Sequence, residues 1–374
     1  MNTTIKSIIS VSFMEKLRNF GGGWIHQDIL QERWASNGIF INKVGNIEVA
    51  SFTLLEMLKA TLKSMTLSLS TLRKFSFNDI IISESPYPPD VILSSRLSRK
   101  FNKPMTIYIH HVTPGFFFYP FRRGIFRVAV NRIYIVILLA FAKIFQIPIF
   151  LDNPNTIKIN GLVVLPDLDA VAFLNSDKYH AADLNQTVDI CYIGRIQKSK
   201  GIEDIIKVVR IIVRKYNFTP KVILAGRGEE KYVRKIKKMI DGYGLSNNII
   251  LKGFISDEEK IELLRSSKLF ISLSYEEGWS LSVMEAAACG LPVVAYELPA
   301  YYYLRGNYFK VRPSDILNCA ETVVNVISDY QSSYLTGKKA KELAIKFNYD
   351  FISNQQLIFF KKIIRDFYDS DRGF

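Results

Sequence analysis

The chain has 374 residues, of which 48% are hydrophobic and 22% are charged, a balance typical of folded globular proteins. This composition excludes a disordered, collagen-like or coiled-coil protein, and the length favours two domains. The formal net charge of +14 indicates anionic partners such as nucleic acid, nucleotides or membrane head groups.

Apolar runs alternate with amphipathic stretches along the chain, which predicts parallel sheets flanked by helices. In the first half we expect strands at 5–11, 79–83, 105–110 and 147–151, and helices at 24–35, 90–100 and 125–146.

The second half repeats the alternation more regularly. Residues 159–187, between the halves, lack a clear hydrophobic period and are interpreted as a hinge. We expect strands at 188–193, 222–225, 249–251, 269–273 and 292–295, with helices at 202–216, 229–243, 257–266 and 281–289, and one or two helices at 349–368.

Neither a targeting segment nor a membrane span is expected. The apolar run near the start is short and is followed by Glu15 and Lys16, so we interpret it as a buried strand and not as a signal peptide. The most hydrophobic stretch, 133–142, is followed by Lys143 and is about half as long as a membrane-spanning helix requires.

The three cysteines, Cys191, Cys289 and Cys319, have no CxxC spacing and no clustered histidines near them. This pattern favours reduced, buried thiols in a cytosolic protein over a disulfide framework or a structural zinc site.

Two glutamates mark the densest motif, in residues 272–295. A strand is expected to end there, and a helix to begin near Ser280, where open amides can bind phosphate. Glu277 lies in the turn and Glu285 about five residues into the helix, roughly 7 Å along its axis. The two carboxylates could hold different hydroxyl-bearing parts of one long ligand. Alternatively, Glu277 caps the helix and Glu285 pairs with a surface lysine.

Two further loops follow predicted strands. After the first, Gly194 frees the backbone, and Arg195 and Lys200 bring two cations to the carboxyl end of the strand. Open α/β sheets bind ligands at this edge, and a guanidinium with an ammonium suits a diphosphate. The second loop carries Gly226 directly after its strand.

In this order and spacing, the motifs resemble those of the GT4-type glycosyltransferases with the GT-B fold, over most of residues 188–315. The matching segments are GRIQKSKG, AGRGEE, LKGFIS and EGWSLSVMEAAACGLPVVA, the last resembling the E-x7-E element of that family. The resemblance implies two Rossmann-like domains facing across a cleft, with a C-terminal helix that crosses back to the N-terminal domain.

Donor binding is what the resemblance implies for these residues. Arg195 and Lys200 would hold the diphosphate, Glu277 a hydroxyl of the transferred sugar, and Glu285 the ribose hydroxyls. Glycines and main-chain amides would complete the donor site, namely Gly194, Gly226, Gly278, Trp279, Ser280 and Leu281.

One segment departs from the family pattern. Where the family commonly has a double-glycine turn followed by a glutamate, this chain has the tyrosine-rich sequence 296–303. We expect this segment beside the donor cleft, which leaves the identity of the sugar open.

The first half resembles the family more loosely. Gly22 and Gly23 resemble its glycine loop between the first strand and helix, where the backbone approaches donor and acceptor; a plain glycine linker is the alternative. His110 stands where the family has a histidine near the transferred sugar, and His111 where it usually has aspartate. A structural role for either histidine is the alternative.

A basic, aromatic stretch lies between Asp90 and Asp152, which enclose nine lysines or arginines and no acidic residue. Its segment 115–132 is typical of an interfacial membrane anchor, of a groove for single-stranded nucleic acid, or of a buried helix with a basic rim. The resemblance favours the membrane surface, because many relatives act on lipid-linked acceptors, and nucleic acid is not expected.

The sequence therefore predicts a glycosyltransferase that moves a sugar from a nucleoside diphosphate sugar to a hydroxyl of a glycan or lipid-linked acceptor. Retention of configuration, the absence of a metal or other cofactor, and a peripheral position on the inner face of the cell membrane are implied by resemblance. Expected domains are 1–170 for acceptor and 171–348 for donor, with 349–374 packing back on the first. A non-catalytic nucleotide-sugar-binding protein is the alternative.

Overall fold

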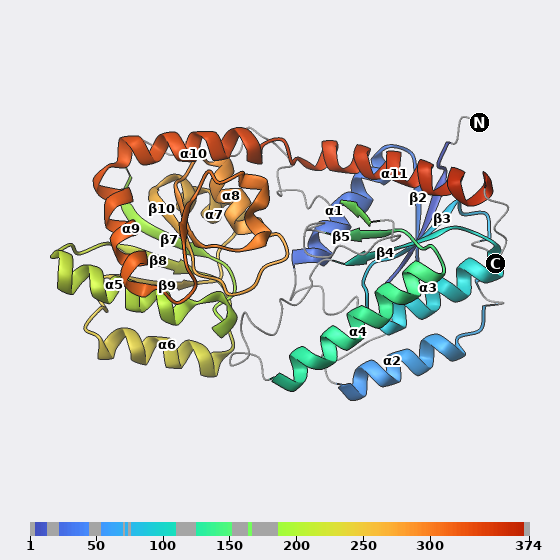
Figure 1. Ribbon diagram of the computed structural model, residues 1–374, viewed down its shortest axis with the longest axis horizontal. Coiled ribbons are helices and arrows are strands. Elements are labelled where there is room, and N and C mark those ends of the chain that lie inside the picture. The colour runs from blue at the N-terminus through green and yellow to red at the C-terminus, as the bar shows by residue number, and fades with distance from the viewer. Residues whose placement is uncertain are drawn as a thin grey trace. The chain divides into compact units, whose positions relative to one another are not determined.

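The computed structural model describes residues 4–12, 22–44, 54–69, 72–73, 76–109, 125–151, 164–166 and 186–369. These residues divide into two compact units (Figure 1). The first holds the described parts of 4–109, 126–166 and 349–369, and the second holds 186–348. Each unit is a parallel sheet with helical connections, so the predicted α/β class is confirmed.

The first unit is a six-stranded parallel sheet in the order β2-β1-β3-β4-β5-β6. Its inner strands are buried along their whole length, which explains why they read as unbroken apolar runs. The elements are β1 (Ser7–Val11), α1 (Gly22–Ser36), β2 (Phe40–Val44), α2 (Leu54–Thr66), β3 (Ile80–Ser83), α3 (Pro88–Phe101), β4 (Met105–Ile109), α4 (Ile125–Ile144), β5 (Ile149–Leu151) and β6 (Val164–Pro166).

Two elements that precede the strand at 79–83, β2 and α2, were not predicted. The stretch 159–187, interpreted as a hinge, contains the short strand β6. One expectation for this unit was wrong. Gly22 and Gly23 do not lie in a loop before the helix, since α1 begins at Gly22.

The C-terminal segment is a single helix, α11 (Tyr349–Asp369), which packs within the first unit. The ring of Phe360 meets Trp34 of α1 edge-on at 5.2 Å and Phe150 of β5 at 5.7 Å between centroids. Asp350 pairs with Arg33 at 3.4 Å. The expected helical return of the chain to its N-terminal domain is confirmed.

The second unit has strand order β12-β11-β10-β7-β8-β9, again parallel throughout. Its elements are β7 (Val188–Ile193), α5 (Ile202–Tyr216), β8 (Val222–Ala225), α6 (Glu230–Gly242), β9 (Ile249–Gly253), α7 (Asp257–Arg265), β10 (Ser267–Ser272), α8 (Leu281–Ala288), β11 (Val293–Tyr296), β12 (Phe309–Val311), α9 (Ile316–Ser328) and α10 (Tyr330–Ala344).

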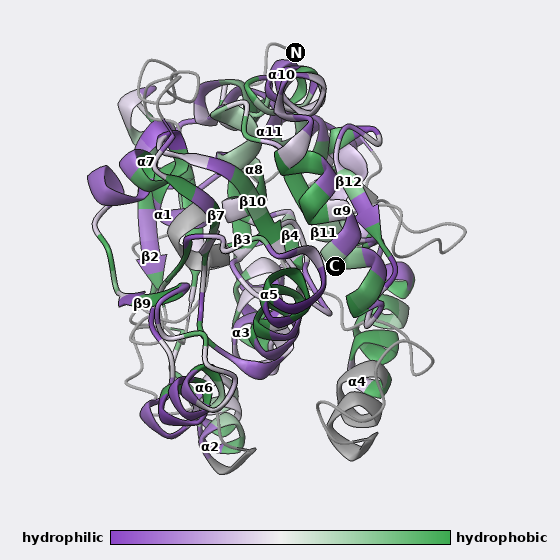
Figure 2. Ribbon diagram, turned by 90° about the vertical axis from the view of Figure 1, so that its left-hand side faces the viewer, coloured by the Kyte–Doolittle hydropathy of each residue, from purple (hydrophilic) through white to green (hydrophobic). Residues whose placement is uncertain are grey.

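Helix α5 illustrates how this unit closes its core. Its aliphatic residues lie mainly on one face and are buried against the sheet, α6 and α9, whereas its charged residues, apart from the buried Asp204, lie on the other face (Figure 2). Such a stripe at helical spacing is what a surface helix needs in order to cover a sheet. Cys191, Cys289 and Cys319 are free and buried in this unit, as predicted.

Candidate functional site

Three loops meet at the carboxyl edge of the second sheet, where the central strand β7 lies between β8 and β10. Gly226 follows β8 with φ +143°, and a Cβ there would lie 1.8 Å from the carbonyl oxygen of Gly194. Gly201 has φ +68°, and its Cβ would lie 1.9 Å from the carbonyl oxygen of Leu273. Both positions therefore require glycine for the backbones to approach.

The loop after β7 carries the two predicted phosphate-binding cations. Arg195 is exposed, and its carbonyl accepts a hydrogen bond from the Tyr192 hydroxyl at 3.0 Å. Lys200 ends a short 3₁₀ turn that begins at Lys198. This turn is held to the loop after β10, because the Tyr275 amide donates to the carbonyl of the turn's middle residue at 2.9 Å.

Lys200 and Glu277 form an ion pair, with Nζ 2.6 Å from Oε1. Their side chains are only 15% and 12% exposed, so the pair is largely shielded from water. The structure therefore brings one predicted cation and one predicted carboxylate into direct contact. The capping role considered for Glu277 is not observed, because Ser280 occupies the N-cap of α8.

The start of α8 lies directly after this pair in the chain. Ser280 has φ +71°, in the left-handed region, which is unusual for a residue other than glycine. Leu281 opens the helix, so the amides of the first turn follow the Glu277 turn as predicted. Trp279 itself is buried, at 2% exposure, and its ring belongs to the protein core.

The tyrosine-rich segment 296–303 is mostly buried and packs against the end of β10 and the turn that carries Glu277. Tyr303 donates to the carbonyl of Trp279 at 3.1 Å, and the Tyr301 and Ser272 hydroxyls lie 3.2 Å apart. Burial raises the pKa of both phenols well above the ordinary value, and the nearby Glu277 carboxylate adds to the effect. Both hydroxyls therefore stay protonated.

Asp204 is a buried functional candidate that sequence reasoning missed. It lies in the first turn of α5, 1% exposed, and accepts hydrogen bonds from the hydroxyls of Tyr275 and Tyr296, the latter at 3.0 Å. Lys207 pairs with its other oxygen at 3.1 Å. The available signal was an acidic residue three positions after Gly201, at a position of α5 that continues its apolar face.

Glu285 lies within α8, on its buried side, and is 5% exposed. Its Oε1 is 2.7 Å from Nζ of Lys260 in α7, which also pairs with Asp257 at 2.9 Å. Burial raises the pKa of Glu285, against the opposing attraction of Lys260. The lysine partner considered from sequence is thus present, although it is a 14% exposed side chain and not a surface residue.

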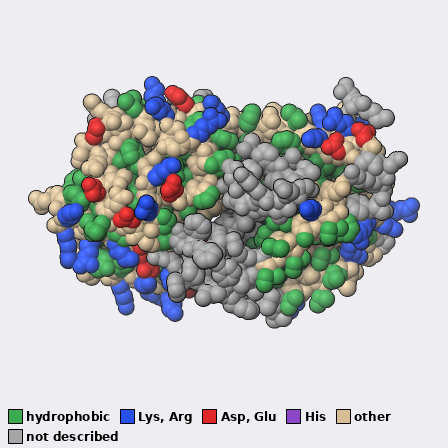
Figure 3. Space-filling view, in the orientation of Figure 1, with side chains coloured by type: hydrophobic (Ala, Val, Ile, Leu, Met, Phe, Trp, Pro, Cys, Tyr) green, Lys and Arg blue, Asp and Glu red, His purple; other side chains and the backbone are tan. Residues whose placement is uncertain are grey.

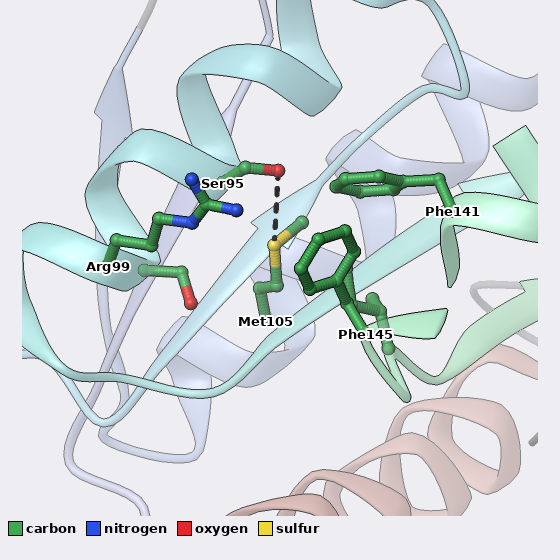
Figure 4. Close-up of a pocket in the computed structure, with 7 residues that line it drawn as sticks. Ser95, Arg99, Met105, Phe141 and Phe145 are labelled. Atoms are coloured by element: carbon green, nitrogen blue, oxygen red, sulfur yellow. Dashed lines mark hydrogen bonds between the residues drawn. The ribbon is translucent and has the colours of Figure 1, made fainter. Parts of the chain in front are cut away.

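The site residues predicted for the first unit include His110 and His111, which lie outside the described residues, as does the aromatic core of segment 115–132. A pocket in this unit, between α3, β4 and α4, is lined by Ser95, Arg99, Met105, Phe141 and Phe145 (Figure 4). Its volume of about 10 Å³ is at the lower limit for one water molecule, so it is no sugar site.

Among the described residues, no three or more His, Cys, Asp or Glu side chains form a group that could hold a metal ion. None of the helices described is long and apolar enough to cross a membrane.

The fold matches that of solved structures with two parallel-sheet α/β domains. Sucrose-phosphate synthase from Thermosynechococcus elongatus superimposes with a TM-score of 0.76 at 15% identity, covering 96% of this chain and 100% of that one. HepE from Anabaena, solved with UDP and glucose, gives 0.70 at 15% identity, with the same two coverages. The GT-B fold predicted from the sequence is confirmed.

Residues 179–342 match the family described as glycosyl transferases group 1. Among curated relatives, poly(ribitol-phosphate) alpha-N-acetylglucosaminyltransferase of Staphylococcus aureus is 30% identical over 214 residues, which are 52% of this chain and 42% of the relative. The chain thus spans less than half the length of that relative. The family prediction from the E-x7-E motif is confirmed, whereas the individual residue roles stay predictions.

Proposed function

We propose that this protein is a glycosyltransferase that moves a sugar from a nucleoside diphosphate sugar to a hydroxyl of a glycan or lipid-linked acceptor. The observation that carries the proposal is the shielded ion pair between Lys200 and Glu277, placed where three glycine-bearing loops meet the start of α8. Support from relatives comes from the S. aureus protein, a poly(ribitol-phosphate) alpha-N-acetylglucosaminyltransferase, and from the HepE structure, which contains UDP and glucose.

The ion pair suggests how the donor is recognised. Without donor, Lys200 and Glu277 neutralise each other at 2.6 Å, which avoids an unpaired buried charge. A bound donor would offer each of them a better partner, since a diphosphate oxygen suits the ammonium and a sugar hydroxyl suits the carboxylate. Arg195, exposed on the same loop, would close on the diphosphate from solvent.

Transition-state stabilisation follows from the same placement. When the bond between sugar and diphosphate breaks, negative charge develops on the leaving phosphate. Lys200, Arg195 and the first amides of α8 would face that charge, the amides with the positive end of the helix dipole. We propose on this basis that the reaction needs no divalent metal, and by family resemblance that it retains the anomeric configuration.

The acceptor side is proposed to work at an anionic membrane surface, on the cytoplasmic face. Helix α4 exposes Ile133, Val136, Ile137 and Ile144 to 60% or more, and Figure 3 shows apolar side chains gathered over this helix. The same stretch of sequence carries nine cations and no acidic residue between Asp90 and Asp152. Apolar side chains beside cations suit the interface of an anionic bilayer.

The proposed reaction is tested by incubating the protein with a panel of nucleoside diphosphate sugars and measuring release of the nucleoside diphosphate, with and without excess EDTA. We expect release from at least one donor, accelerated by a hydroxyl acceptor and unaffected by EDTA. Binding of a donor without any release would instead indicate the non-catalytic binding protein. Loss of activity with EDTA, restored by manganese, would contradict metal independence.

A further inference from the structure

The turn that carries Glu277 is held by tyrosines from one other segment of the chain. The turn runs from Tyr275 to Ser280 and connects β10 to α8. The segment 296–303 begins at the end of β11 and continues as a 3₁₀ turn over Pro299–Leu304. Three tyrosines of this segment make hydrogen bonds around the turn. Tyr303 bonds to the turn itself, Tyr301 to the end of β10, and Tyr296 to Asp204, which also accepts a hydrogen bond from the turn.

At the start of the turn, the hydroxyls of Tyr275 and Tyr296 converge on one oxygen of Asp204. Both phenols are buried, and their rings meet edge-on at 5.3 Å between centroids. The carboxylate of Asp204 belongs to α5, directly after the loop that carries Lys200. These bonds therefore fix the beginning of the Glu277 turn against the base of the Lys200 loop.

At the end of the turn, Tyr303 holds Trp279 in two ways. Its hydroxyl donates to the Trp279 carbonyl at 3.1 Å, and its ring lies 4.4 Å from the indole at an interplanar angle of 31°. Phe347 closes the same indole edge-on at 5.3 Å. The next residue is Ser280, whose φ of +71° is a conformation that persists when the surroundings over-determine it.

Behind the turn, Tyr301 lies against the last residue of β10. Its hydroxyl is 3.2 Å from that of Ser272, and it is 1% exposed. The strand end, the start of the turn and the end of the turn are thus each held by a different tyrosine of one short segment. Buried hydrogen bonds of this kind specify a single conformation when every member is satisfied.

We propose that Tyr296, Tyr301 and Tyr303 are positioning residues that fix Glu277 and the first amides of α8 for transfer, with Tyr303 the most important. The inference rests on the proposed function and deepens it, because it assigns the tyrosine-rich segment a role in turnover. A carboxylate misplaced by a fraction of an ångström still binds donor but loses alignment with the reacting centre. The hydroxyls act through the turn and do not touch the donor.

The test removes one oxygen at a time with Tyr303→Phe, Tyr301→Phe and Tyr296→Phe, each of which keeps its ring. Tyr308→Phe is the matched control, since Tyr308 packs edge-on against Tyr301 at 5.5 Å, while no hydrogen bond from its hydroxyl to the described turn is present. For each variant, kcat, the KM for donor, the affinity for the free nucleoside diphosphate and the melting temperature are measured with the donor that the wild type uses.

We expect Tyr303→Phe to lower kcat roughly 10-fold, while nucleoside diphosphate affinity changes less than about 2-fold and Tyr308→Phe behaves as wild type. Equal kcat in Tyr303→Phe and wild type would overturn the inference. An equal loss of kcat in Tyr308→Phe would also overturn it. The same holds if the loss in Tyr303→Phe disappears when each protein is assayed at the same number of degrees below its own melting temperature. An inactive wild type would instead contradict the proposed function itself.

Discussion

Lys200 and Glu277 form the ion pair at the centre of the proposed donor site. They are joined at 2.6 Å and little exposed, so each is the main counter-charge of the other until a ligand arrives. Removing one partner of such a pair leaves a shielded charge behind. Effects of single substitutions here on stability and on activity must therefore be measured separately.

Replacement of either cation tests the proposed diphosphate assignment. We expect Lys200→Ala or Arg195→Ala to raise the activation barrier by at least ~2 kcal/mol, about 30-fold in kcat/KM, because each is proposed to face developing negative charge. Steady-state kinetics with the preferred donor measures the effect, and circular dichroism verifies folding. Turnover equal to wild type in both variants would remove the diphosphate role.

Substitutions of the two glutamates of the E-x7-E motif should affect different kinetic quantities. Glu285→Gln is expected to weaken donor binding chiefly, since a ribose contact is the same before and during reaction, whereas Glu277→Gln should lower kcat more. Titration calorimetry with the donor, alongside turnover numbers, distinguishes the two. An unchanged dissociation constant for Glu285→Gln would show that its pairing with Lys260 is its whole function.

At the scale of elements, burial explains which strands could be predicted. The predicted ranges for β7, α5 and β8 agree with the structure, because central strands buried on both faces read as apolar runs. The missed strands β2, β6 and β12 all lie at a sheet edge. Two of them have only three residues, and β2 exposes Phe40 to 74%, so none shows a clear period.

The candidate site was predictable to a similar extent. Motif spacing placed Arg195, Lys200, Glu277 and the start of α8 at one edge of the sheet, as observed. Sequence could not show that Lys200 and Glu277 pair with each other, because that contact depends on how two loops fold together. Nor could it show that segment 296–303 is buried support, since a run of tyrosines suits a ligand cleft equally well.

The buried cysteines provide a test of packing in the second unit. Burial raises the pKa of the Cys191, Cys289 and Cys319 thiols to about 12, so the reactive thiolate is almost absent at pH 8. We expect none of the three to react with Ellman's reagent in the native protein and all three to react in guanidinium chloride. A thiol that reacts rapidly under native conditions would show that its element opens or packs differently.

At the scale of the whole molecule, the +14 charge and the exposed apolar face of α4 bear on where the protein works. Four arginines of segment 115–132 near an anionic surface would contribute about 1 kcal/mol each, which corresponds to roughly millimolar affinity before aromatic insertion adds to it. The described residues show the apolar side of this region, while the side chains of the arginines lie outside them.

Membrane association is measured by co-sedimentation with anionic and with neutral liposomes. We expect anionic vesicles to bind the protein, moderate salt to weaken binding by screening, and replacement of the four arginines by glutamine to abolish it while sparing slow hydrolysis of the donor. The matched control changes four exposed cations of α6. The replaced arginines are Arg122, Arg123, Arg127 and Arg132, and the control residues are Lys231, Arg234, Lys237 and Lys238.

Equal sedimentation with both kinds of liposome, or with neither, would reject the interfacial interpretation and leave 115–132 as an ordinary buried segment. An equal loss of binding in the α6 control would show that net charge alone, and not this region, attracts the protein to the bilayer.

The central claim is that the carboxyl edge of the second sheet binds a nucleoside diphosphate sugar through Lys200. Thermal unfolding in the presence of each nucleotide sugar tests it most directly, because a ligand that binds the folded state raises its melting temperature by mass action. The account predicts that at least one nucleoside diphosphate sugar stabilises the wild type and that Lys200→Ala loses most of this shift. No stabilisation by any donor, or an equal shift in wild type and Lys200→Ala, would contradict it.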